Sequence, residues 1–172
     1  PEGVAWDLPL LLKAIDSAEQ RVRIQLLSYY LTDRDGTYWP VLDNALRAAG
    51  ARGVEVQIIL SNWAKSQHSV PWLQSLAAVP NVEIKFSNIP EHSAGFIPFA
   101  RVEHPKYLTV DGRSAWIGTS NWSRDYFYQS RNVSLFLDGK DVVKYLDRFF
   151  EKGWEGSHTE TIEPCGKYKA PK

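Results

Sequence analysis

Two short segments decide how this chain folds, His104-Pro105-Lys106-Tyr107-Leu108-Thr109-Val110-Asp111 and Gly118-Thr119-Ser120-Asn121. The first has the apolar character of a strand, and residues two apart on a strand face the same side. We therefore expect His104 and Lys106 to point into one pocket. An imidazole beside an ammonium suits an anionic substrate, because lysine offers a point charge for phosphate and histidine can act as nucleophile, acid or base near neutral pH.

The other polar residues of these segments are placed by the turn between them. Asp111 lies at the far end of the strand from His104, since seven extended residues span more than about 20 Å. It could therefore serve an imidazole across a fold or subunit boundary better than His104 itself. Asn121 would add amide donors at the histidine's end of the sheet if the two strands form a hairpin. The alternative is a surface histidine and lysine beside an ordinary hairpin.

The sequence before these segments alternates between helix and strand patterns. Apolar residues recur at helical spacing or alternate with polar ones, and Pro, Gly and Asp mark the boundaries. This alternation predicts an α/β domain with a mixed, mostly parallel sheet flanked by helices. The expected helices cover 6–19, 39–49 and 70–79, and the expected strands cover 21–30, 54–60 and 82–86.

The second half of the chain predicts a long loop, a set of strands and a closing helix. Residues 87–99 contain prolines and a glycine without periodicity, and so predict a loop long enough to be functional. Strands are expected at 102–110, 114–117 and 131–137, with a turn at 111–112 and a helix at 141–150. We assign 1–155 to a single domain and 156–172 to a loose polar tail.

Composition excludes several classes of protein. The chain has 172 residues, of which 44% are hydrophobic and 23% charged, as in one ordinary globular domain. With 20 basic and 20 acidic residues it has no net charge, so phosphate contacts would need a local cluster of cations. The lone Cys165 excludes an internal disulfide. The absence of methionine indicates a processed chain or a piece of a longer one.

Metal binding is not indicated by the remaining histidines and acidic residues. His68, His92 and His158 are scattered without paired ligand spacing. Asp33 and Asp35 precede a glycine as in a calcium loop, but the distal glutamate is absent, so this segment predicts a turn. We expect no metal and no other cofactor.

Aromatic residues make up 13% of the chain and gather near the two segments. Each could stack on an unpaired base or belong to the core. The candidates are Trp63, Phe96 and Phe99 before the histidine, and Trp116, Trp122, Tyr126, Phe127 and Tyr128 after it.

The combined pattern H-x-K-x(4)-D-x(6)-G-[ST]-x-N resembles the HKD signature of the phospholipase D superfamily. It would arise by chance in fewer than about one chain in a hundred thousand. Segments 38–43, 52–54, 75–78, 97–102, 116–123 and 126–127 are similar to the C-terminal half of that superfamily's animal lysosomal branch. That branch comprises membrane-anchored five-prime exonucleases of single-stranded nucleic acid, with phospholipid-related activities also attributed to it. The resemblance alone suggests a lysosome-like lumen.

The resemblance implies a phospholipase D-like domain with phosphodiesterase chemistry. His104 would form a phosphohistidine intermediate or act as the general acid and base facing it. Lys106 and Asn121 would bind the non-bridging phosphate oxygens, and Asp111 would have a structural or histidine-orienting role. The residues expected to line the substrate pocket are Lys106, Thr119, Ser120, Asn121 and Trp122.

Two features of the family pattern are missing from this chain. Many members carry a glutamate about a dozen residues after the asparagine, where this chain has Arg131-Asn132-Val133-Ser134. The mechanism also needs two motifs, so a second copy of the chain or a missing N-terminal half must supply one, and we favour the missing half.

The expected substrate is single-stranded nucleic acid. The alternatives are a phospholipid head-group ester and a non-catalytic half that relies on its partner's histidine.

Overall fold

The computed structural model describes residues 6–33 and 35–169 and builds them around one seven-stranded sheet. The strand order is β6-β5-β4-β1-β2-β3-β7. The strands are β1 (Arg21–Leu26), β2 (Glu55–Ser61), β3 (Val82–Ser87), β4 (Lys106–Val110), β5 (Ser114–Gly118), β6 (Ser134–Asp138) and β7 (Thr159–Thr161).

The sheet is mixed, as expected, but it is mostly antiparallel and not mostly parallel. Among the described strands, β1–β2 and β2–β3 are parallel, whereas the other four neighbouring pairs are antiparallel. Of these neighbouring pairs, only β1–β2 and β2–β3 are consecutive in the chain and joined by a helix of eight or more residues, as a parallel crossover uses. The connection from β4 to β5 is a tight turn that reverses the chain direction, so this expectation was wrong for the second half.

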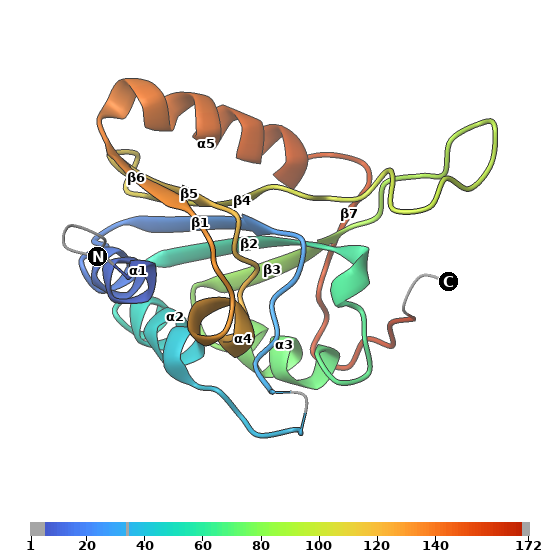
Figure 1. Ribbon diagram of the computed structural model, residues 1–172, viewed down its shortest axis with the longest axis horizontal. Coiled ribbons are helices and arrows are strands. Elements are labelled where there is room, and N and C mark those ends of the chain that lie inside the picture. Colours follow the sequence, from blue (N-terminus) through green and yellow to red (C-terminus); the bar gives the residue numbers. More distant parts are fainter. Residues whose placement is uncertain (1–5, 34, 170–172) are drawn as a thin grey trace.

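Helices cover both faces of the sheet (Figure 1). On one face lie α1 (Asp7–Asp16), α2 (Val41–Ala51), α3 (Val70–Ala77) and the short α4 (Arg124–Tyr128), while α5 (Lys140–Trp154) covers the other. A single 3-10 turn, η1 (Asn62–Ala64), follows β2. The main core packs α1 and α2 against the sheet, and a smaller cluster of Ile59, Tyr107 and Phe150 lies under α5.

A buried polar network fixes α5 on the sheet. The guanidinium of Arg23 is buried, its Nε donates to Gln57 Oε1 at 3.1 Å, and its Nη1 donates to Glu151 Oε1 at 3.0 Å. The same nitrogen lies 3.4 Å from Asp147 Oδ1, which also accepts from Thr109 Oγ1 at 2.7 Å. Because a buried charge needs such partners, the network sets one position of the helix along β1 and β4.

The C-terminal segment is ordered by the sheet and not loose. Strand β7 pairs antiparallel with β3, and Ile162 directly after it is buried in the core. The ring of Tyr168 packs against Phe86 with centroids 5.1 Å apart. Up to residue 169 this segment therefore forms part of the fold, and residues 170–172 lie outside the described part. No helix among the described residues is long and apolar enough to cross a membrane.

Candidate active site

The two motif segments converge at one edge of the sheet. Strand β4 begins and β5 ends there, because they pair antiparallel with Tyr107 opposite Ile117. The predicted hairpin is thus confirmed. Strand β1 ends at the same edge, with Leu26 opposite Lys106. The carboxyl ends of the parallel strands also lie there, which is where open α/β sheets bind their ligands.

The histidine lies just before the strand that was expected to hold it. Strand β4 begins at Lys106 and not at Val102, since Pro105 has no N–H to donate to a ladder. His104 is exposed, and Lys106 Nζ donates to its carbonyl oxygen at 3.0 Å. Both residues line one cavity of about 480 Å³, together with Thr119 from the end of β5. The structure therefore brings the imidazole and the ammonium to one pocket.

The ammonium of Lys106 is held in a poorly solvated place. The residue is only 8% exposed, and burial lowers the pKa of the ammonium below its usual value. A positive charge that is shielded from water attracts an anion more strongly than the charge of a solvated surface lysine does. Lys106 is thus suited to hold a phosphate oxygen rather than to act as a solvated surface charge.

Asn121 and Ser120 bring polar atoms to the same edge from the segment after β5. Both residues are buried, and, contrary to the expectation from the sequence, neither lines the cavity that His104 and Lys106 share. Asn121 Nδ2 donates to the Tyr126 hydroxyl at 3.2 Å. Asn121 Oδ1 and Ser120 Oγ have no hydrogen-bond partner among the described residues. Unpaired buried polar atoms are uncommon in proteins and often mark functional sites.

Thr119 is hydrogen-bonded to Asn132, which lies in the segment where the family pattern would have a glutamate. Its Oγ1 donates to Asn132 Oδ1 at 3.0 Å and accepts from the Val133 backbone N–H at 3.2 Å. Segment 131–134 thus orders the pocket rim through an amide.

The glycine of the second segment has a packing role. A Cβ built on Gly118 would clash with the indole carbons of Trp116, which lies two residues earlier on the same face of β5. Only glycine leaves room for this ring, so the close approach positions the end of β5.

The structure does not bring Trp122 to the pocket. Its indole is fully buried in the core, edge-on to Tyr29 with centroids 5.7 Å apart and beside Trp116 at 6.3 Å. Its backbone accepts from Tyr30 N at 2.8 Å and donates to Ser28 O at 3.2 Å. A large aromatic ring is more stable when buried. Trp122 anchors the Asn121 segment to the end of β1.

Asp111 also lies away from the pocket, at the opposite end of β4. Its carboxylate accepts backbone N–H groups of Glu19 at 3.0 Å, Gln20 at 2.9 Å and Arg21 at 2.8 Å. Partial burial works to raise the pKa of this carboxyl, but the three backbone N–H groups outweigh it and the pKa is lowered. The geometry gives Asp111 a structural role, joining the β4–β5 turn to the start of β1.

Replacing Asp111 with asparagine is expected to lower the free energy of unfolding by about 1–3 kcal/mol at pH 7. Asparagine tolerates the positive φ of 53° at this position but loses the charge that three N–H groups share. The measurement is urea unfolding of Asp111→Asn beside Asp16→Asn, an exposed carboxylate that should cost little.

The pH dependence has a definite sign. Because folding lowers the pKa of Asp111, its stabilisation is full above the ordinary value of 3.8 and disappears as the pH falls through the folded value. The free energies of unfolding of the wild-type protein and of Asp111→Asn, measured against pH, should therefore converge in acid. A difference between these two free energies that stays constant down to acid pH, or no difference at pH 7, would contradict this role.

A side-chain relay that the sequence did not predict holds the residue before the histidine. The Tyr107 hydroxyl donates to Gln25 Oε1, and Gln25 Nε2 donates to Glu103 Oε1 at 2.7 Å. Burial, followed by the charges of Glu103 and Asp147, raises the pKa of Tyr107. The only signal in the sequence is a glutamine at an inward-facing position of an apolar strand.

The pocket has the groups needed for attack on a phosphorus centre. The exposed imidazole of His104 can form or break a bond, and the buried ammonium of Lys106 can hold an anionic oxygen. The amide of Asn121 lies at the same edge of the sheet, outside the lining of this pocket. No group of three or more His, Cys, Asp or Glu residues that could hold a metal occurs among the residues described.

Sequence comparison finds the same kind of domain. Residues 11–154 match the family model described as cardiolipin synthase, PLD-like domain. The chain is 35% identical over 163 residues to phospholipase D Y of Dictyostelium discoideum, covering 91% of this chain and 37% of that protein. It is 34% identical over 182 residues to human 5'-3' exonuclease PLD4, covering 95% of this chain and 36% of that protein. The chain thus spans little more than a third of the length of these relatives.

Solved structures share the fold at the level of whole chains. NucT from Helicobacter pylori superposes with a TM-score of 0.70 at 23% identity, covering 86% of this chain and 87% of its own. Nuc from Salmonella typhimurium, described as a phospholipase D family member, gives a TM-score of 0.69 at 20% identity and covers 94% and 92%.

Proposed function

The chain belongs to the family of phospholipase D-like domains, and on that basis we propose that it is a phosphodiesterase working through a phosphohistidine intermediate. One observation carries the proposal: His104 and Lys106 line the same cavity at the sheet edge where Asn121 also lies. The chemistry needs a nucleophile beside groups that stabilise phosphate charge, and this edge supplies both.

The reaction proceeds in two displacements. A histidine nitrogen attacks phosphorus, the P–N bond forms, and the P–O bond to the leaving group breaks while a second histidine protonates the departing oxygen. Water, deprotonated by that second histidine, then attacks phosphorus and releases the first. Lys106 Nζ and the second N–H of Asn121 Nδ2 donate to the non-bridging oxygens, where charge builds in each transition state.

Single-stranded nucleic acid is the proposed substrate. A relative that aligns over 95% of this chain is named a 5'-3' exonuclease, which supports this ranking. A phospholipid head-group ester is the second candidate, because another relative is named phospholipase D Y.

The second histidine must come from another domain of the same kind. The motif occurs once in the sequence, and its pocket is lined in part by Leu146 and Phe149 of α5. Val142, Tyr145 and Phe149 are exposed at helical spacing, and Leu135 on the edge strand β6 is exposed beside them. We call these four residues the α5–β6 patch.

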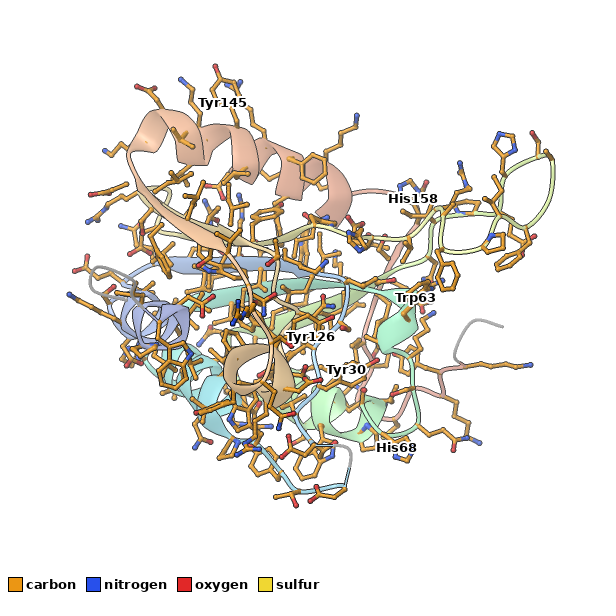
Figure 2. All side chains as sticks on the ribbon, in the orientation of Figure 1. Tyr30, Trp63, His68, Tyr126, Tyr145 and His158 are labelled. Atoms are coloured by element: carbon orange, nitrogen blue, oxygen red, sulfur yellow. The ribbon has the colours of Figure 1, made fainter. Side chains whose placement is uncertain are left out.

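The patch is continuous with the pocket. Phe149 lines the cavity that holds His104, and Tyr145, on the outward side of α5, is 64% exposed (Figure 2). Clusters of exposed apolar side chains mark interaction sites. A second motif-bearing domain docked at the Phe149 end of this patch would face the pocket of the first.

The variant Tyr145→Glu is expected to lower phosphodiester turnover at least about 10-fold without unfolding the chain, because a charge in a docking surface disfavours association. The measurement is turnover of 4-nitrophenyl methyl phosphate in excess EDTA, fraction by fraction after size separation. The control is Leu10→Glu, which places the same charge at an exposed position on α1, on the other face of the sheet.

Activity should occur only in fractions that contain two motifs. Turnover by a strictly monomeric sample of this chain would contradict the requirement for a second motif. Equal losses in Tyr145→Glu and Leu10→Glu would remove the α5–β6 patch from the account.

A further inference from the structure

A second and larger cavity is formed in part by the loop that precedes the motif histidine. Its volume is about 1030 Å³, and it lies between Tyr30 after β1, Trp63 in η1 and loop residues 96–101. Neither His104 nor Lys106 lines it. In Figure 1 the loop that forms one wall extends from the end of the sheet that carries the motif. The proposed chemistry therefore leaves this cavity unassigned.

The walls are aromatic and exposed. Phe96 is 66% exposed and Phe99 83%, although both are large apolar side chains. Phe99 lies edge-on to the half-exposed Trp63, with ring centroids 6.2 Å apart and an angle of 74°. These rings add little to the core, so their placement points to a contact with something outside the chain.

The loop backbone also departs from its easiest conformation. Phe99 has φ of 59° and Arg101 has φ of 55°, in the left-handed region that a bulky residue rarely adopts. The side chain of Arg101 donates through Nε to the Pro90 carbonyl within the same loop. Unfavourable backbone dihedral angles in an exposed loop point to a functional role, because core packing does not impose them there.

The cavity lies within reach of a strand bound at the motif. Strands β4, β1 and β2 are neighbours, so Trp63 after β2 lies about two strand spacings, roughly 10 Å, along the edge from Lys106. Tyr30 on the wall of this cavity also lines another cavity together with Tyr126, the hydrogen-bond partner of Asn121. Figure 2 shows Tyr30 and Tyr126 on the same side of the sheet.

Resting on the proposed nuclease function, we propose that this cavity binds the unpaired bases of single-stranded nucleic acid next to the phosphate held at Lys106. Bases have flat faces that stack on aromatic rings and polar edges that hydrogen-bond. Trp63, Phe96 and Phe99 offer the rings, and Asn62 and Arg101 offer donors on the same walls. A lipid chain would leave those polar groups against hydrocarbon, which is unfavourable.

The test separates stacking from phosphate binding. Binding of a labelled oligothymidylate and of an abasic strand of equal length is measured by fluorescence anisotropy in EDTA, with the intact protein. The wild-type protein should bind the thymidylate strand more tightly than the abasic strand. In Trp63→Ala and in Phe99→Ala the affinity for thymidylate should fall about 5- to 100-fold, while the affinity for the abasic strand should change little.

The control is Phe136→Ala, because Phe136 on β6 is about as exposed as Trp63 and lies away from the cavity. Equal binding of both strands by the wild-type protein, or unchanged thymidylate affinity in both cavity variants, would overturn the inference. So would variants that lose binding only to phosphatidylcholine vesicles, because the cavity would then serve a membrane surface.

The same samples distinguish this inference from the proposed catalysis. Turnover of 4-nitrophenyl methyl phosphate, which carries no base, should be equal in the wild-type and both cavity variants. If the variants lose the preference for the strand with bases, base binding in the cavity is supported even if no diester is hydrolysed. Turnover without any base preference would retain the phosphodiesterase and remove the stacking site.

Discussion

Replacing His104 with alanine is expected to lower turnover of a single-stranded oligonucleotide by at least about 10⁴-fold. Whether this imidazole attacks phosphorus or protonates the leaving group, no other described residue of the pocket can do its work. The measurement is kcat of the whole assembly in excess EDTA, compared with His158→Ala, which removes an exposed histidine from the C-terminal segment.

The fold should survive this change, since His104 is exposed and precedes the first residue of β4. Its unfolding midpoint should match that of the wild-type protein. An unchanged rate would show that the partner's histidine suffices, which would make this chain a non-catalytic half.

Replacing Lys106 with methionine is expected to lower kcat/KM by about 10²–10³-fold. Methionine keeps a flexible apolar stem but removes the charge that would face the non-bridging oxygens. The measurement is kcat/KM for the oligonucleotide beside Lys140→Met, which removes an exposed lysine at the start of α5.

Stability separates this effect from misfolding. Burial lowers the pKa of Lys106, so the charged form is disfavoured in the folded protein at every pH below the ordinary value of 10.5. Lys106→Met should therefore be at least as stable as the wild-type protein at neutral pH. A less stable variant with near-normal kcat/KM would contradict the phosphate-binding role.

Local spacing was sufficient to predict the centre of the site. The turn after Asp111 forces a hairpin, and the hairpin brings the segments of Lys106 and Asn121 to one edge. These statements depend on residues close in sequence, whose geometry strand periodicity determines.

Long-range partners could not be predicted in this way. The three N–H groups that hold Asp111 come from residues 19–21, about ninety positions away. Trp122 follows Asn121 directly in the sequence, yet its ring packs against Tyr29 and Trp116 in the core. Strand β7 has only three residues, so its pattern is too short to detect without β3 beside it.

Incubation with two substrates tests the central claim most directly. Labelled single-stranded oligonucleotide and phosphatidylcholine vesicles are each mixed with the size-verified assembly in excess EDTA, and released nucleotides and head groups are measured. We predict that the oligonucleotide is shortened and that His104→Ala abolishes the reaction. Release of the head group alone, or no hydrolysis of either substrate by an assembly with two motifs, would contradict the account.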